Sequence, residues 1–485
     1  MDTARALFAR LAAEGAMIEA LSSDSRHCAP GVAFLAYPGE RADGRRHIGD
    51  AIGRGAPAVL WESEGFAWRG EWRVPNVGVR NLKARAGGLA HEFYGRPSDR
   101  LWVCGVTGTN GKTSCSQWIA AALGARGTRA AVIGTLGTGF PGALVDSPNT
   151  TPDALEIHKL LQQFLAEGAS AVAMEVSSHG LAQGRVHGVA FDCALFTNLS
   201  HDHLDYHGSM EAYAQAKAQL FDAPGLACAV LNLDDVMGVR LAQRLEGSSV
   251  RVIGYSVSGA RSGSEYLAAT RLGHGEMEIE SSWGRVTAKV NQVGRFNMAN
   301  ALGVLGCLVA HGVAFEEAAA MLARLPAVPG RMQQVGDRPL VVVDYAHTPD
   351  ALEKVLQALR PVAAQRGGRL VAVFGAGGDR DPAKRPAMGA VVSRLADRAV
   401  VTSDNPRSED PLKIIQAIRA GISGDCEVEP DRARAIAASI AAAADADVVL
   451  IAGKGHESYQ EIAGRRHAFS DVAAARDALR RRGHA

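Results

Sequence analysis

The chain has 485 residues, a net charge of +1, 47% hydrophobic residues and 21% charged residues. These values are typical of a globular protein with about three domains of ~150 residues, and they give no reason to expect a nucleic acid or an anionic membrane as partner. Seven scattered cysteines without a C-x-x-C pair indicate free thiols in a reducing compartment, which argues against a disulfide or zinc framework.

Neither the first residues nor the Ala-rich stretch near the C-terminus has the pattern of a membrane or export segment. Residues 1–21 contain Asp2, Glu14 and Glu19 and lack the apolar centre of a signal peptide. Asp445 and Asp447 interrupt the stretch 435–453. We therefore expect no membrane span and a cytoplasmic location.

Residues 1–97 predict a small α/β unit with short apolar strands at 32–35 and 58–60. Two polar loops, 22–26 and 39–45, offer several hydrogen-bond donors, although solvated turns have the same composition. Gly95 and Pro97 predict a boundary before the next strand.

The stretch 101–123 predicts a phosphate-binding loop. An apolar strand at 101–106 leads into a turn with Gly108 and Gly111, and a helical pattern follows from about Ser114. Glycines let backbone N–H groups surround phosphate oxygens, Lys112 can reach a terminal phosphate, and Thr113 can face Mg²⁺. The strict P-loop spacing is not met, and a chance Gly-rich turn is the alternative. Because strand, glycines, Lys-Thr pair and helix coincide, we interpret the loop as an ATP site.

Residues 98–330 alternate strands and helices. Strands are predicted at 101–106, 129–133, 171–176, 194–197, 228–231 and 250–253. A helix is predicted between them, with Thr151 as N-cap, Pro152 at its first position and Gly168 just past its end. Short apolar strands with helical crossovers predict a parallel sheet covered on both faces. Alternation at 276–280 and 286–290 adds an antiparallel hairpin, before a helix at 296–310.

Pro326, Pro329 and Gly330 mark a second boundary. Buried strands are then predicted at 340–343, 370–374, 399–402 and 448–451, each followed by a polar loop at the edge where open α/β sheets bind ligands. No G-x-G-x-x-G motif follows these strands, which disfavours a dinucleotide site.

Carboxylates and histidines follow two central strands. Glu175 ends a strand expected beside the phosphate-loop strand, where it could hold Mg²⁺ or serve as a cap or ion-pair partner. The His/Asp cluster at 201–205 could suggest zinc, but Mg²⁺ is the natural companion of ATP; a lone His is more often structural. By composition alone, Lys217 is typical of a helix surface.

Six motifs occur in the order seen in one enzyme family, at 107–113, 175–179, 202–205, 294–297, 344–347 and 453–457. On these motifs the chain resembles the Mur ligases over nearly its whole length. The resemblance implies three α/β domains: residues 1–97 for the UDP end of the substrate, a central P-loop-type parallel-sheet domain at 98–330 for ATP, and a Rossmann-like domain at 331–485 for the amino acid.

The resemblance also assigns nucleotide and metal contacts, with ATP and Mg²⁺ as cofactors. It implies ATP-binding residues Gly108, Thr109, Asn110, Gly111, Lys112, Thr113, Ser114, Asn297, Arg331 and Asp344. It implies metal contacts from Thr113, Glu175, His203 and Lys217, the last as an N6-carboxylysine, since carbamylation converts a cation into an anionic oxygen ligand. Catalysis would rest on Lys112, Glu175, His203 and Lys217.

Two substrate sites are implied in the same way. The UDP-substrate would contact Ser23, Ser25, Glu40, Arg41, Ala42, Asn149, Thr150, Thr151, Ser177, Gln183 and Arg185. The loop at 402–407 is similar to that of members that add meso-diaminopimelate, which would contact Arg380, Asp404, Asn405, Pro406, Arg407, Gly453 and Glu457. Two residues depart from the family pattern: Ser114 stands where many members have Thr, and His201 stands where a polar or basic residue is more usual. Neither change removes a required hydrogen-bond donor.

The implied reaction is ATP-dependent amide formation in peptidoglycan synthesis, through an acyl phosphate on the D-glutamate γ-carboxylate of a UDP-muramoyl dipeptide. Folylpolyglutamate synthetase or another Mur ligase would share the ATP motifs, but the loops at 23–26 and 404–407 count against both. A nucleotide-binding regulator or motor ATPase would hydrolyse ATP without an amino acid. The expected partners are small molecules; the sequence does not fix the oligomeric state, and we expect a monomer.

Overall fold

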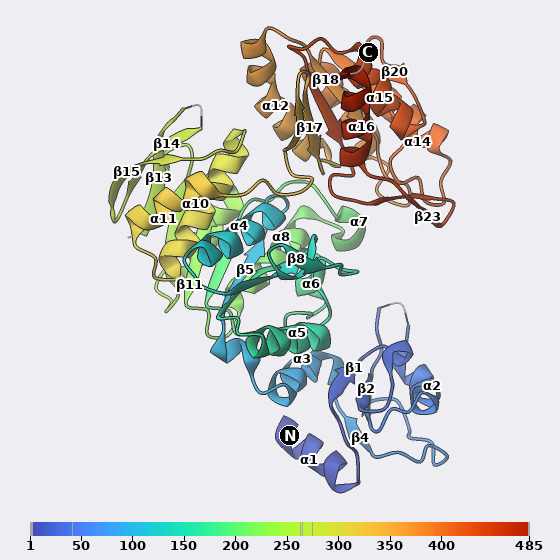
Figure 1. Ribbon diagram of the computed structural model, residues 1–485. Coiled ribbons are helices and arrows are strands. Elements are labelled where there is room, and N and C mark those ends of the chain that lie inside the picture. The colour runs from blue at the N-terminus through green and yellow to red at the C-terminus, as the bar shows by residue number, and fades with distance from the viewer. Residues whose placement is uncertain (1–2, 41, 262, 264, 274, 484–485) are drawn as a thin grey trace.

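The computed structural model describes residues 3–40, 42–261, 263, 265–273 and 275–483. Three α/β units, each built on its own sheet, follow one another from the blue N-terminal end to the red C-terminal end of Figure 1. This arrangement confirms the predicted fold class. Within the described residues, no helix combines the length and the apolar character needed to cross a membrane.

The N-terminal unit is a four-stranded parallel sheet with helices on both faces. Its strands lie in sequence order: β1 (Ala20–Ser22), β2 (Val32–Ala36), β3 (Val59–Glu62) and β4 (Asn76–Val79). Its helices are α1 (Ala4–Ala13), α2 (Ile48–Gly53) and α3 (Leu82–Phe93). Leu155, from the next unit, packs into the core under α1 and α3, which joins the two units.

The central sheet has eleven strands in the order β15-β14-β13-β12-β11-β10-β5-β9-β6-β7-β8. In chain order these are β5 (Trp102–Thr107), β6 (Ala130–Gly134), β7 (Gly137–Phe140), β8 (Ala143–Val145), β9 (Ala171–Glu175), β10 (Cys193–Phe196), β11 (Cys228–Asn232), β12 (Arg251–Ser256), β13 (Glu265–Leu272), β14 (Glu276–Ser281) and β15 (Gly284–Lys289). In the spatial order of the sheet, the seven neighbouring strands β13-β12-β11-β10-β5-β9-β6 are parallel. The strands added at the two ends, β14 and β15 at one and β7 and β8 at the other, pair antiparallel.

Helices cover both faces of this sheet. They are α4 (Lys112–Ala125), α5 (Ala154–Ala166), α6 (Ser178–Ala182), α7 (Leu204–His207), α8 (Met210–Ala218), α9 (Val236–Leu245), α10 (Arg295–Ala310) and α11 (Phe315–Met321). Trp118 of α4 and Leu305 of α10 belong to the core on one face, and Leu161 of α5 and Leu241 of α9 to the core on the other. Buried apolar area on both faces fixes the sheet and hence the loops at its carboxyl edge.

The C-terminal sheet has six strands in the order β16-β17-β21-β18-β19-β20, parallel except for β16. They are β16 (Gln333–Asp337), β17 (Leu340–Asp344), β18 (Leu370–Phe374), β19 (Arg398–Val401), β20 (Glu427–Val428) and β21 (Val448–Ala452). The helices are α12 (Pro349–Arg366), α13 (Lys384–Leu395), α14 (Pro411–Arg419), α15 (Arg432–Ala442) and α16 (Asp471–Gly483). A separate hairpin is formed by β22 (Tyr459–Ile462) and β23 (Arg465–Ala468).

Several predicted elements are confirmed, including the parallel central strands, the hairpin β14–β15 and helix α10. The predicted helix start at Thr151 is wrong. The N-cap is Asp153, whose carboxylate accepts the N–H groups of Leu155 and Glu156. The Thr151 hydroxyl instead donates to the Glu175 carbonyl oxygen, a contact that depends on the tertiary structure.

The strands that were not predicted are β1, β4, β7, β8, β13, β16, β20, β22 and β23. β7 is rich in glycine and β8 has three residues, so neither has the alternating apolar pattern that predicts a strand. All seven cysteines are free, as expected, and the thiols of Cys104, Cys193 and Cys307 lie in contact in the core.

Candidate active site

A cleft of 1130 Å³ lies where loops of all three units meet. Its walls include Glu40 from the N-terminal unit, Lys112 and Glu175 from the central unit, and Arg407 and Glu457 from the C-terminal unit. Most of the predicted site residues line it: Glu40, Thr109, Asn110, Gly111, Lys112, Thr113, Ser114, Asn149, Thr150, Thr151, Glu175, Ser177, Gln183, Arg185, His203, Asn297, Arg331, Asp344, Arg380, Asp404, Asn405, Arg407, Gly453 and Glu457. The fold thus brings together residues almost 420 positions apart.

The phosphate-binding loop joins β5 to α4 and requires glycine at two positions. Gly108 has φ +148°, and a Cβ there would lie 1.9 Å from the Thr197 hydroxyl oxygen; Gly111 has φ +88°, and a Cβ there would lie 2.5 Å from Asn300 Oδ1. Both residues therefore pack against neighbouring segments with no space for a side chain. The half-buried Lys112 lies at the start of α4, and its Nζ donates to the carbonyl oxygens of Gly108 and Thr109.

Glu175 lies at the end of β9, directly beside β5, as predicted. Its buried carboxylate accepts hydrogen bonds from the hydroxyls of Thr113 (3.0 Å) and Thr135 (3.0 Å) and from the Thr135 N–H (2.8 Å). Gly134 is required here, because a Cβ at that position would lie 2.3 Å from Glu175 Oε1. The Thr113 hydroxyl and the Glu175 carboxylate are hard oxygen donors, a set that suits Mg²⁺.

His203 lies in the loop after β10, beside Asp202 and His179. Its Nε2 is 3.3 Å from Asp202 Oδ2, and its ring centroid is 4.8 Å from that of His179. Burial lowers the pKa of His203 to about 3, and Asp202 only partly opposes this shift. The imidazole is therefore uncharged at neutral pH.

Lys217 does not lie on a helix surface. The side chain comes from α8 and is 1% exposed; its Nζ donates to the Gly108 carbonyl oxygen (2.9 Å) and lies 4.4 Å from the centroid of the Tyr213 ring. Lys217 forms no ion pair with a carboxylate of the described chain. Burial, followed by the charge of Lys112, lowers the pKa of Lys217 well below its ordinary value. The structure therefore favours an uncharged amine directly under the phosphate-binding loop.

The three predicted ATP-binding residues outside the phosphate-binding loop, Asn297, Arg331 and Asp344, also line the cleft. Asn297 is buried at the start of α10, and Arg331 NH2 donates to the Thr113 hydroxyl oxygen (3.2 Å), with its guanidinium 4.4 Å from the Tyr345 ring centroid. Asp344 uses its carboxylate to accept the N–H groups of Met332 and Ala346, both at 2.7 Å. Asp344 thereby shapes the segment that links the central and C-terminal units.

On the opposite side, a polar group joins the first two units. Glu40 accepts hydrogen bonds from Gln183 Nε2 (2.8 Å) and from the Tyr206 hydroxyl (2.7 Å). Arg185 donates to Gln183 Oε1 and to the Thr151 carbonyl oxygen. This group places amide, guanidinium and carboxylate functions on one wall of the cleft.

A few predicted contacts lie outside the cleft walls. Ser23, Ser25 and Ala42 belong to the N-terminal unit but do not line the cleft, and Arg41 lies outside the described residues. Pro406 is buried behind Arg407 in the loop after β19, so it shapes the loop without facing the cleft. Gly108 and Lys217 lie just beneath the wall formed by the phosphate-binding loop.

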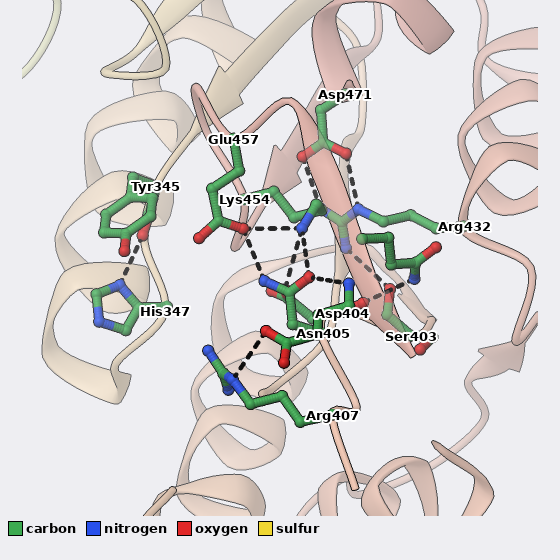
Figure 2. A network of polar contacts seen from close by, with 12 residues as sticks. Tyr345, His347, Ser403, Asp404, Asn405, Arg407, Arg432, Lys454, Glu457 and Asp471 are labelled. Carbon is green, nitrogen blue, oxygen red and sulfur yellow. Dashed lines mark hydrogen bonds and ion pairs between the residues drawn. The ribbon is translucent and has the colours of Figure 1, made fainter. Parts of the chain in front are cut away.

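Three of the predicted amino-acid contacts, Asp404, Asn405 and Glu457, form a connected network with Lys454 (Figure 2). Lys454, which is 0% exposed, donates to Asn405 Oδ1 (2.9 Å) and to Glu457 Oε2 (2.8 Å), and its Nζ is 3.7 Å from Asp404 Oδ1. Asn405 Nδ2 also donates to Glu457 Oε2. Arg407 lies at the edge of this network, where its NH1 donates to the Gly378 carbonyl oxygen. Acidic and basic groups thus share one end of the cleft.

Sequence reasoning missed several residues of the site. Thr135 follows a buried strand, a position where open α/β sheets bind ligands, but neither of its direct neighbours in the sequence is a polar residue that would indicate a site. Arg432 and Asp471 form a buried ion pair whose side chains are 0% exposed, and Arg432 also donates to the carbonyl oxygens of Ser403 and Ala452. In the sequence each has the appearance of a charged helix residue, so no local signal could have identified them.

Comparisons with known proteins give the family. The models for the Mur ligase catalytic domain, the middle domain and the glutamate ligase domain match residues 17–94, 106–308 and 330–455. A relative from Chromobacterium violaceum is 51% identical over 96% of this chain and 95% of its own length, and one from Ectopseudomonas mendocina is 52% identical over 96% of each; both are named UDP-N-acetylmuramoyl-L-alanyl-D-glutamate–2,6-diaminopimelate ligase. A solved structure with that name is 36% identical, covers 96% of both chains and has a TM-score of 0.68. The chain belongs to the Mur ligase family.

Proposed function

We propose that this protein is an ATP-dependent ligase that joins meso-2,6-diaminopimelate to the D-glutamate γ-carboxylate of UDP-N-acetylmuramoyl-L-alanyl-D-glutamate. The observation that carries the proposal is the shared cleft, which is lined by the phosphate-binding loop, by Glu40 and Arg185, and by the acid–base group of Asp404, Arg407 and Glu457. The names of relatives about 50% identical over nearly the whole chain support the same reaction.

The chemistry needs positioning and charge stabilisation more than a protein nucleophile. The substrate γ-carboxylate attacks the terminal phosphorus of ATP, which gives an acyl phosphate and ADP. The amine then attacks the acyl carbon, loses a proton and displaces phosphate. Lys112, at the N-terminus of α4, stabilises the negative charge that builds on the phosphoryl oxygens. Arg185 and Gln183 orient the carboxylate substrate on the opposite wall.

Thr113 and Glu175 would hold Mg²⁺, since their oxygens already converge at 3.0 Å and suit a hard cation. The cation supplies Lewis-acid stabilisation of phosphoryl charge when bound. We further propose that Lys217 is carbamylated. An uncharged amine is the form that reacts with CO₂, and the burial of Lys217 favours that form. The carbamate would place an oxygen ligand beside His203.

The amino-acid end recognises a molecule with an ammonium and a carboxylate at its far end. Asp404, Asn405 and Glu457 offer acceptors for the ammonium, and Arg407 offers a fork for the carboxylate. Arg380 lines the same cleft and would hold the other carboxylate. L-lysine lacks the distal carboxylate, so its binding would leave the Arg407 fork with only the Glu461 carboxylate of the described chain, 3.7 Å away, in a partly closed site.

Phosphate release from ATP tests the proposal. We expect release that requires UDP-muramoyl dipeptide and meso-diaminopimelate together, with a preference over L-lysine of roughly 10² or more in kcat/KM. A folate substrate with glutamate serves as the control for the related ligases. Release without any amino acid would favour a regulator or motor ATPase, and equal kcat/KM for diaminopimelate and lysine would refute the assignment.

Compartment and assembly follow from the same reaction. All seven cysteines are free thiols, which is typical of proteins from a reducing compartment, and the substrate is a UDP-activated precursor. We infer that the enzyme acts in the cytoplasm in peptidoglycan synthesis. One chain supplies all of the groups used in the reaction, from the cleft walls and, for Lys217, from just beneath them, so a monomer suffices.

A further inference from the structure

Arg432 and Asp471 form a buried ion pair behind the amino-acid end of the cleft. Arg432 is the first residue of α15 and Asp471 the first of α16, and the side chains of both are 0% exposed. Arg432 Nε donates to Asp471 Oδ1 and its NH2 donates to Oδ2, each at 2.7 Å. The pair is therefore bidentate, with the guanidinium held in a fixed plane.

The remaining donors of Arg432 reach two loops that are far apart in the sequence. NH2 donates to the Ala452 carbonyl oxygen (3.0 Å) and NH1 to the Ser403 carbonyl oxygen (3.4 Å). Ala452 immediately precedes Gly453, and Ser403 immediately precedes Asp404. In Figure 2 the guanidinium lies between Asp471 and these loops. One side chain thus holds the starting points of both segments that carry the amino-acid contacts.

The two loops touch one another where Arg432 holds them. Gly453 has φ +122°, and a Cβ there would lie 2.4 Å from Asp404 Oδ2 and 3.8 Å from Arg432 NH2. Farther into the cleft, Lys454 from one loop donates to Asn405 of the other. A shift of either carbonyl would therefore move Asp404, Asn405 and Glu457 relative to one another.

We propose that Arg432 and Asp471 are positioning residues that set the spacing of the 403–407 and 452–457 loops and thereby the selectivity for the amino acid. The inference rests on the proposed function, because it concerns the same end of the cleft. Neither residue lines the cleft, so neither is a catalytic or contact residue. A lysine at 432 would keep the charge but lose the planar fork that reaches an acid and two carbonyl oxygens together.

Two conservative variants test the pair, Arg432→Lys and Asp471→Glu, the second of which shifts the carboxylate by one methylene and keeps both charges. We expect KM for meso-diaminopimelate to rise roughly tenfold in each, because small misplacements of contact groups are costly. KM for ATP and for the UDP-substrate should change by less than about twofold, and the preference over L-lysine should shrink by roughly tenfold.

Matched controls lie on the same helices. Arg434→Lys on α15 alters an exposed pair with Asp431, and Asp477→Glu on α16 alters an exposed pair with Arg480 and Arg481. Both should leave every KM unchanged. The thermal midpoint of unfolding is measured for all four variants. Kinetic assays are then run at a temperature at which every variant is folded.

A purely structural pair would give variants with a lower midpoint but an unchanged KM and an unchanged amino-acid preference, and that result would overturn the inference. Failure of the unmodified enzyme to use meso-diaminopimelate would instead refute the proposed function. The two failures are therefore distinguishable.

Discussion

Two fully buried lysines, Lys217 and Lys454, lie behind different parts of the cleft wall in contrasting electrostatic surroundings. Lys217, under the phosphate-binding loop, faces a carbonyl oxygen and an aromatic ring, and the nearby charge of Lys112 further lowers its pKa. Lys454, at the amino-acid end, faces Glu457, Asp404 and the Asn405 amide oxygen. The first environment favours a neutral, reactive amine, whereas the second places the lysine against two carboxylates. Burial alone therefore does not tell which role a lysine has.

The largest effect is expected from Lys217→Ala. If a carbamate on Lys217 supplies an oxygen ligand, the variant should lose roughly 10³-fold in kcat while its affinity for ATP changes little. Acetate should partly restore activity by occupying the vacated space. Lys217→Met fills that space and serves as the control in which acetate gives no rescue; full activity in Lys217→Ala would refute the role.

Substitution of Lys454 and of Lys217 should have different effects on the free energy of unfolding. Lys454→Met leaves Glu457 and Asp404 without their buried cation and should lower the free energy of unfolding by about 3–5 kcal/mol. Lys217→Met removes a buried amine that has no carboxylate partner among the described residues and should lower it by less than about 1 kcal/mol. Urea denaturation measures both values, and equal losses would contradict the contrast drawn between the two sites.

At the amino-acid end, Arg407→Ala should raise KM for meso-diaminopimelate roughly 10²-fold, equivalent to about 2.7 kcal/mol, through loss of a charge-assisted pair. KM for ATP should stay within about twofold, and the preference over L-lysine should shrink. Arg419→Ala, on the exposed face of α14, is the matched control. An unchanged KM for diaminopimelate in Arg407→Ala would remove Arg407 from the recognition site.

His158, at the contact between α3 and α5, is another group whose pKa is lowered by burial, as that of Lys217 is. It is 0% exposed, its Nε2 donates to the His187 carbonyl oxygen (3.0 Å), and its ring lies beside His91. Burial lowers the pKa of His158 to about 4, the His187 carbonyl opposes this, and His91 adds to it. Because its pKa in the unfolded chain is about 6.5, the unfolded state takes up the proton first as the pH falls.

The stability that neutral His158 contributes is therefore present above pH 6.5 and is lost between about pH 6.5 and pH 4. The titration of His158 alone should therefore lower the free energy of unfolding by about 2 kcal/mol between pH 7 and pH 5. In His158→Gln, whose amide can still donate to the His187 carbonyl, this part of the pH dependence should disappear. His47→Gln, at an exposed position, should retain it; identical pH profiles for all three proteins would exclude His158 as the cause.

The sequence by itself determined the features that depend on neighbours along the chain. β5, Gly108, Gly111 and α4 form the phosphate-binding loop within some twenty-five residues, and each has a local signal in the sequence: an apolar strand, glycines in a turn, a helix start. Glu175 was placed beside that loop because parallel strands end at one edge of a sheet. The roles of contact residues came from the family resemblance, and the domain limits at 97 and 330 stay predictions.

The tertiary structure alone decided which polar residues are buried together. Lys217 lies in a stretch with the composition of a helix surface and yet is buried under Gly108. Asp153 caps α5, while the Thr151 hydroxyl donates to the Glu175 carbonyl oxygen. Arg432 and Asp471, 39 residues apart, meet only after two helices pack on one sheet. Burial and pairing of charges depend on contacts between distant segments, and local patterns contain no information on those contacts.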